Sequence, residues 1–265
     1  MIIFGIVATF LAFCYINYKL SMRWVKIKRF SVEVGLPKNA KGFKILHISD
    51  VHNASETVLT LDFFKNTYKH EFDIVVITGD MTVSYFEQIL PLKPYLQELA
   101  EVVPVFFVDG NHEKIMYEGV KEFLEDCGVH VLANEKRTLE YEGEKFELIG
   151  LRDHDYLLQN GYSEFEAIFE DNGRFKLVLQ HQPQLFERIK YYENVFMLSG
   201  HTHGGQVRFW PLPTLYAPRQ GILPKYGNGL YKFRNNHIYI SKGIGTTIFP
   251  IRFFNRPEVA IIELM

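Results

Sequence analysis

The sequence predicts an α/β protein in which two sheets are covered by helices. In the first half of the chain, apolar runs of strand length alternate with segments of helical spacing, as in β-α units. After Gly128, short strand-like runs follow one another with little sequence between them. β-α units followed by a meander of strands are expected to form two sheets with helical cover.

Length and composition are those of a globular protein with a sizeable core. The chain has 265 residues, of which 47% are hydrophobic and 23% charged. Its formal net charge of −2 and the lack of a basic stripe argue against a nucleic-acid partner. Cys14 and Cys127 are its two cysteines, too few for a disulfide framework or a thiolate metal site. Any bound metal must therefore be held by oxygen and nitrogen atoms.

Residues 1–18 form an uncharged apolar run, MIIFGIVATFLAFCYINY. A membrane-spanning helix needs about 20 apolar residues, so the run is at the short edge of what can span. No basic residue precedes it, which argues against a cleaved signal peptide. We expect one N-terminal transmembrane anchor at 1–18; the alternative is a buried helix of the domain. Basic side chains follow the run and favour the cytoplasmic side: Lys19, Arg23, Lys26, Lys28 and Arg29.

The body is expected to begin with a basic juxtamembrane segment and a lead-in strand at 19–42, followed by one domain at 43–265. Strands are expected at 44–49, 74–78, 103–108, 129–133, 137–141, 145–149, 175–179, 195–198, 237–241 and 259–264. Helices are expected at 59–69, 85–100 and 117–127, the second kinked by its prolines and the third closed by Gly128. Residues 207–230, rich in Pro, Gly and aromatics, read as a long loop.

Polar residues gather at the carboxyl ends of these strands, where open α/β sheets place their ligand sites. The set comprises two carboxylates, one amide and four imidazoles: Asp50, His52, Asp80, Asn111, His181, His201 and His203. In the segment Gly200–Gln206, the two histidines are one residue apart, so extended backbone would point both rings to the same side. Mixed oxygen and nitrogen donors suit Mn, Fe or Zn. The set as a whole predicts a metal site.

The order and spacing of these motifs resemble the calcineurin-like metallophosphoesterase superfamily, over about residues 44–264. The closing segment 250–258 and the Gly-His-Thr-His-Gly-Gly-Gln block are similar to its membrane-anchored bacterial phosphodiesterase branch. The resemblance implies a four-layer α/β/β/α sandwich of two mixed sheets and two divalent metal ions. Some members of the wider group cleave the pyrophosphate of UDP-diacylglucosamine.

The resemblance also implies a role for each residue of the set. Asp50, His52 and His203 would hold the first metal, and Asn111, His181 and His201 the second. Asp80 would bridge the two ions. His112 would contact the substrate phosphate or protonate the leaving oxygen, without binding metal.

The reaction that this arrangement predicts is hydrolysis of a phosphodiester or pyrophosphate by a metal-bound hydroxide. One departure stands out, because many family members carry an aspartate where this chain has Val83, which leaves His112 without its usual orienting carboxylate. A phosphomonoesterase or protein phosphatase is the main alternative. A membrane-tethered scaffold without turnover is a further one, although no ligand has been lost.

Two apolar segments favour a membrane-associated or lipid-linked substrate. Residues 209–216 directly follow the His201/His203 loop and contain Trp and Tyr, which prefer membrane interfaces. Residues 247–254 could extend the same surface. The alternative is that both segments pack onto the sandwich as core.

Overall fold

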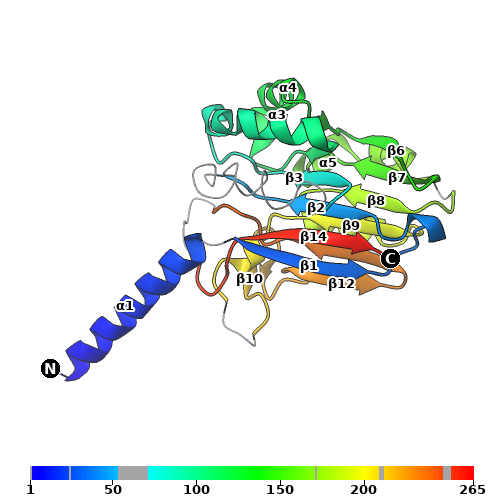
Figure 1. Cartoon of the computed structure of the whole chain (residues 1–265). Helices are drawn as coiled ribbons and strands as arrows, with labels where there is room; N and C mark the ends of the chain where they lie inside the picture. Colours follow the sequence, from blue (N-terminus) through cyan, green and yellow to red (C-terminus); the bar gives the residue numbers. More distant parts are fainter. Residues whose placement is uncertain (1, 24, 53–70, 171, 209–211, 247–251) are drawn as a thin grey trace.

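The computed structural model describes residues 2–23, 25–52, 71–170, 172–208, 212–246 and 252–265. The helix expected at 59–69, Trp210 and most of the 247–254 segment lie outside these ranges. Two six-stranded sheets and their helices make up the body. Figure 1 shows how these elements are arranged. The predicted pair of mixed sheets is thus confirmed.

The first sheet has the strand order β1-β14-β2-β3-β4-β5. Its strands are β1 (Lys26–Val32), β2 (Lys44–Ile48), β3 (Ile74–Thr78), β4 (Val105–Val108), β5 (His130–Val131) and β14 (Glu258–Leu264). β2 to β5 run parallel, β14 is antiparallel to β2, and β1 is parallel to β14. β3 is buried at every position, as expected for a parallel strand covered on both faces.

The second sheet has the order β12-β13-β9-β8-β7-β6. Its strands are β6 (Glu135–Tyr141), β7 (Glu144–Gly150), β8 (Lys176–Leu179), β9 (Val195–Ser199), β12 (Gly229–Phe233) and β13 (Asn236–Ile240). β7, β8, β9 and β13 are parallel, and β6 and β12 close the edges as antiparallel strands. The expected long loop at 207–230 contains a small hairpin of β10 (Tyr216–Ala217) and β11 (Gly221–Ile222).

Three apolar clusters fix how these parts pack. One lies between the first sheet and the helices α3 (Lys93–Val102) and α4 (Tyr117–Asp126), which cover it in Figure 1. A second draws side chains from both sheets, such as Val76 and Phe196. The third lies between the second sheet and α5 (His154–Asn160), α6 (Ser163–Ile168) and α7 (Phe186–Ile189). Short 3₁₀ turns at Lys38–Ala40, Phe86–Leu92, Glu113–Ile115, Pro183–Leu185 and His203–Gly205 join the elements.

The N-terminal segment forms helix α1 (Ile2–Arg23), which projects away from the body in Figure 1. Within the described part of the chain, no helix is both long and apolar enough to cross a membrane. The transmembrane anchor predicted for 1–18 is therefore not supported. The uncharged run ends at Tyr18, whereas the helix continues through Lys19 to Arg23.

His47 is a fully buried imidazole in β2, with its Nε2 2.8 Å from Thr78 Oγ1. Burial lowers its pKa to about 3, so the folded protein keeps this ring neutral. The unfolded chain takes up the proton below pH 6.5, which stabilises the unfolded state and removes folding stability as the pH falls from 6.5 toward 3.

Replacing His47 with glutamine should remove this dependence. From pH 7 to pH 5 the wild-type free energy of unfolding should fall by about 2 kcal/mol more than that of His47→Gln. Urea unfolding at the two pH values measures the difference. Parallel profiles for the two proteins would contradict the assignment of a neutral buried ring.

Candidate metal centre

The loops after five parallel strands meet at one edge of the two sheets. Asp50 follows β2, Asp80 follows β3, and Asn111 follows β4, while the four histidines follow β2, β8 and β9. Glycines allow the loops to approach closely. A Cβ on Gly110 would overlap the Asp80 carboxylate, and one on Gly200 would overlap Ser49 and Asp50. The structure therefore brings the predicted residues together.

Several of these residues have left-handed backbone conformations, which cost energy for any residue other than glycine. They are Asp50, His52, Asp80, His201 and His203, with φ between 46° and 70°. Strain of this kind persists where the surrounding structure enforces it and is concentrated at functional sites. Each strained residue directs its side chain from a sharply turning loop, so the motif geometry differs from the extended backbone expected for the 201–203 pair.

Asp50, His52 and His203 form a first group, with one ligand-type atom from each lying within 4.8 Å of the others. His52 Nε2 is 3.2 Å from His203 Nε2, and His203 Nε2 is 3.3 Å from Asp50 Oδ1. All three side chains are buried. Asp50 is also held by the Ser49 hydroxyl, which donates to its Oδ2 at 2.6 Å.

Asp80, His181 and His201 form a second group of the same kind. His181 Nε2 is 3.0 Å from Asp80 Oδ2, and His201 Nδ1 is 3.2 Å from His181 Nε2. Asn111 is half-buried on the neighbouring loop. Asn111 Oδ1 and His201 Nε2 are both buried and have no hydrogen-bond partner among the residues described. Buried polar atoms left in this way suit a site that receives a further ligand.

Backbone carbonyls orient two of the imidazoles. His52 Nδ1 lies 2.9 Å from the Thr82 carbonyl oxygen, and His181 Nδ1 lies 2.8 Å from that of Thr78. An Nδ1–H that donates to a carbonyl leaves the Nε2 lone pair free for a metal ion. Such contacts are the usual way in which proteins fix metal-binding histidines.

Burial sets the protonation of most of the cluster. It lowers the pKa of His52 to about 4 and that of His201 to about 3, and it also lowers the pKa of His203. These rings are therefore neutral near pH 7, as metal ligation requires. Burial alone would lower the pKa of His181, but the adjacent Asp80 carboxylate raises it well above its usual value. The same pairing lowers the pKa of Asp80, against the effect of its own burial.

His112 sits at the rim of the cluster and is oriented by the residue that departs from the family pattern. Its Nδ1 lies 2.7 Å from the Val83 carbonyl oxygen, and its backbone N–H donates to Asp80 Oδ1 at 3.0 Å. Its Nε2 lies 3.9 Å from Asp80 Oδ2. The Val83 backbone carbonyl therefore orients His112, in place of the aspartate carboxylate that many family members have at this position. By distance alone, His112 also groups with His52 and Asp80.

Glu113, which directly follows His112 in the chain, has a structural role in the site. Its buried carboxylate accepts backbone N–H bonds from Asp80, Met81 and Gly110, each at 2.8 Å. It therefore ties the Asp80 loop to the Asn111 loop. Burial, together with the charge of Asp80, raises its pKa to about 7. The position of Glu113 next to His112 in the motif could have indicated a role in the site. Its backbone partners could not be predicted, because they depend on tertiary structure.

Replacing Glu113 with glutamine should destabilise the fold and loosen the site. The new amide NH₂ would face backbone donors, which should cost about 2–4 kcal/mol in the free energy of unfolding. Chemical denaturation, with Glu122→Gln on the exposed face of α4 as the matched control, measures the loss. Equal stability of the two variants would exclude the proposed tie between the loops.

Arg252 stabilises the loop that carries His203, a role that was not predicted from the sequence. It is fully buried and donates to the carbonyl oxygens of Lys242, Gly243 and Gly245. Its guanidinium also lies 3.3 Å from His203 Nδ1. Asn255 donates to the His203 carbonyl at 2.6 Å. The closing segment of the chain therefore holds the His203 loop in place.

Comparison with known proteins agrees with this geometry. Residues 43–205 match the family described as calcineurin-like phosphoesterases. The chain belongs to that family. The family and the names of the relatives support a metal-dependent phosphoric ester hydrolase. The clustered His and Asp side chains of this phosphoesterase are able to bind metal.

Relatives match the phosphoesterase over most of its length. It is 31% identical to the uncharacterized metallophosphoesterase YkoQ of Bacillus subtilis, over 91% of this chain and 90% of the relative. It is 30% identical to the phosphodiesterase YaeI of Escherichia coli, over 98% and 95%. It is also 30% identical to the uncharacterized metallophosphoesterase YkuE of Bacillus subtilis, over 86% and 81%.

Proposed function

We propose that the protein is a dinuclear metal-dependent phosphodiesterase that hydrolyses phosphodiester or pyrophosphate bonds. The main support is that Asp80, a member of the second group, also lies beside His52 of the first group. Its Oδ2 lies 3.0 Å from His181 Nε2 in one group and 3.8 Å from His52 Nε2 in the other. A carboxylate between two sets of donors suits a pair of ions about 3.5–4 Å apart. The name of the relative YaeI as a phosphodiesterase favours the same reaction.

The donors fit two divalent ions of the Mn, Fe or Zn type. Asp50, His52 and His203 would hold the first, while Asn111, His181 and His201 would hold the second. Asp80 would serve both. The fit is supported by imidazole nitrogens that face each other at 3.2 Å and by the unpartnered Asn111 Oδ1 within the described residues. When bound, the ions would supply positive charge for the anionic phosphoryl oxygens and lower the pKa of bound water.

His112 is proposed to act on the leaving group. The Val83 carbonyl accepts the Nδ1 proton, so the second ring nitrogen, Nε2, is left to exchange a proton with the substrate. Its side chain is 21% exposed, whereas His52 and His181 are fully buried. His112 is therefore the imidazole of this cluster that a phosphoester oxygen can approach from solvent.

Metal analysis of the purified protein, combined with a substrate panel, tests the proposed function. The panel should contain bis(p-nitrophenyl) phosphate, p-nitrophenyl phosphate and a soluble pyrophosphate diester, each assayed with added Mn²⁺ or Zn²⁺. Two equivalents of metal and a preference for the diesters are expected. Preference for the monoester would support the phosphomonoesterase alternative, and no turnover of any ester would exclude the proposal.

We further propose that the enzyme works at a membrane surface on a lipid-linked substrate, with its catalytic domain on the cytoplasmic side. Large apolar side chains of α1 are exposed, including Phe4 at 81% and Phe10 at 62%. Exposed apolar surface of this kind suits contact with lipid. Leu212, Tyr216, Ile222 and Leu223 add exposed apolar groups around the β10–β11 hairpin.

Sheet register supports a position of α1 near the site. Lys26, which starts β1, pairs with Glu258, and Ala260 pairs with His47. Beyond that pairing, the backbone N–H of Glu258 donates to the Gly243 carbonyl, and that of Ile244 donates to the carbonyl of Ser49, the neighbour of Asp50. Phe13 of α1 also packs against Phe254, with ring centroids 6.0 Å apart.

Replacing Phe4 and Phe10 together with serine should reduce binding to anionic lipid vesicles by at least roughly tenfold, since each buried Phe contributes about 1.5–3 kcal/mol. Vesicle flotation measures the loss, and turnover of a small soluble diester should be unchanged. The matched control replaces Val102 and Leu158, which are exposed elsewhere on the body. Vesicle binding that survives in the α1 variant would contradict the proposed role of this helix.

A further inference from the structure

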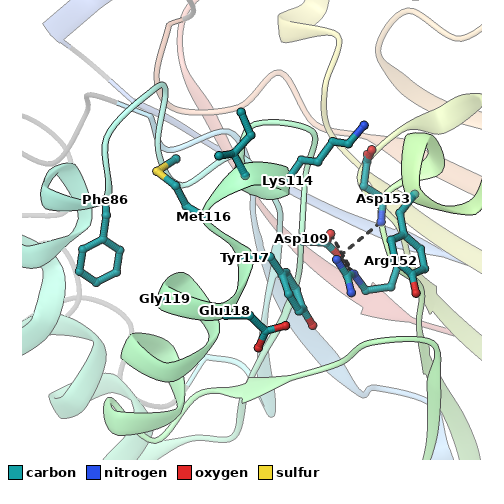
Figure 2. A pocket seen from close by; sticks show the side chains of 11 residues that line it. Phe86, Asp109, Lys114, Met116, Tyr117, Glu118, Gly119, Arg152 and Asp153 are labelled. Atoms are coloured by element: carbon teal, nitrogen blue, oxygen red, sulfur yellow. Dashed lines mark hydrogen bonds and ion pairs between the residues drawn. The ribbon is translucent and has the colours of Figure 1, made fainter. Parts of the chain in front are cut away.

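A cavity of about 570 Å³ opens beside the loop that carries Asn111 and His112. Asp109 and Lys114, which flank that loop in sequence, both line it. The cavity is large enough for a ring-sized group, since small-molecule sites measure about 300–1,000 Å³. Figure 2 shows Phe86 on the side opposite Arg152. The catalytic proposal assigns no role to this cavity.

Arg152 forms a rigid wall of the cavity. Its guanidinium carbon lies 3.5 Å from the ring centroid of Tyr117 and 4.2 Å from that of Tyr156. Its Nε is 3.1 Å from both carboxylate oxygens of Asp109, a buried residue, as the dashed lines of Figure 2 mark. A guanidinium held between two rings and a carboxylate has little freedom to move. Arg152 therefore belongs to a partly buried stack that includes an ion pair with Asp109.

The remaining walls carry both hydrogen-bond donors and hydrogen-bond acceptors. Lys114 is an exposed donor, Glu118 is an exposed acceptor, and Tyr156 carries a hydroxyl. Asp153 is fixed by Gln182 Nε2 at 3.0 Å and by the backbone N–H of Asp155. With three carboxylates against two cations, the cavity is not built for a second phosphate. A hydrocarbon ligand would displace the water that hydrates these polar groups and would offer them no hydrogen bonds in return. Neutral hydroxyls can serve both donors and acceptors, while aromatic walls pack against a ring.

We propose that this cavity binds the hydroxyl-bearing organic group of the substrate, a sugar or similar cyclic polyol esterified to the phosphate. The inference rests on the proposed phosphodiesterase function and defines its substrate class. The phosphate would lie at the metal centre, and the polyol would extend past His112 between Lys114 and Tyr156. Hydrogen bonds from the polyol to these side chains would strengthen binding without changing the chemistry of the leaving group.

Two p-nitrophenyl phosphodiesters test the inference, since they share a leaving group and a ring size. One carries a glucos-6-yl group and the other a cyclohexylmethyl group, which differ in their oxygen functions. With the Mn²⁺-loaded full chain, kcat/KM should be roughly tenfold higher for the glucosyl ester, as two added hydrogen bonds would give. Lys114→Met and Tyr156→Phe should each reduce that preference by roughly threefold to fivefold through KM. For the cyclohexylmethyl ester, kcat/KM should fall less than for the glucosyl ester in both variants, because this ester has no hydroxyls to bond to either side chain.

Matched controls are Lys93→Met and Tyr191→Phe, at exposed positions that do not line the cavity. Equal kcat/KM for the two esters in the wild type would overturn the polyol inference, while their hydrolysis would uphold the phosphodiesterase proposal. Parallel losses on both esters in the cavity variants would overturn it as well. A wild type that hydrolyses neither ester would refute the proposed function, and the polyol inference with it.

Discussion

Asp80→Asn is expected to reduce turnover by more than roughly 10³-fold, because the charge stabilisation supplied by metal ions in phosphoryl transfer amounts to several kcal/mol. The substitution preserves the shape of the side chain but removes the negative charge that both proposed ions would share. Metal content should fall toward one ion or none. Elemental analysis after gel filtration, together with diester turnover, measures both effects.

The structure adds a specific reason for the size of this effect. Asp80 Oδ1 accepts the backbone N–H of His112, and Oδ2 lies 3.0 Å from His181. An asparagine amide turned either way would place NH₂ against a donor or against a ligand nitrogen. Asp73→Asn is the matched control, since its carboxylate accepts a backbone N–H from Lys44 away from the cluster. A variant that keeps two ions and a near-normal rate would show that Asp80 does not bridge.

His112→Ala should lower turnover by roughly 10²–10⁴-fold while both ions stay bound, which is the usual effect of losing a general acid–base group. The loss should shrink for esters with a very good leaving group, since these need no protonation. A series of aryl diesters with increasing leaving-group pKa measures the trend at fixed metal content.

Two other outcomes would assign His112 differently. Loss of metal would identify it as a ligand, an arrangement that its grouping with His52 and Asp80 makes geometrically possible. An equal loss across all leaving groups would indicate a purely electrostatic role. His130→Ala, at an exposed imidazole on β5, controls for removal of a histidine.

Much of the site could be predicted because its ligands follow strands that the sequence marks clearly. The run at 74–78 begins with four consecutive apolar residues, the run at 44–49 contains Ile45, Leu46 and Ile48, and β2 and β3 occupy nearly the same residues. Parallel strands then bring Asp50, Asp80 and Asn111 to one edge. Short apolar runs with polar residues at their ends need no long-range information.

What could not be predicted depends on contacts between segments far apart in the chain. The strained backbone of Asp80, the contacts of the Glu113 carboxylate with backbone N–H groups and the buried Arg252 each arise from packing that a local pattern does not encode. β12 was not among the predicted strands, because its residues alternate between half-buried and exposed at a sheet edge and lie in a segment rich in glycine. The apolar run of 1–18 gave the helix correctly but not its full extent, which reaches Arg23.

Pairing of the first strand with the last has a consequence for how the enzyme is made. β14 lies between β1 and β2, so the first sheet cannot close until the ribosome has released residues 258–264. Until then, β1 and β2 lack the strand that pairs with both of them, and the Arg252 segment does not yet hold His203 in place. Chains that lack residues 258–264 would thus lack a finished catalytic centre. Their unpaired strand edges would also favour aggregation.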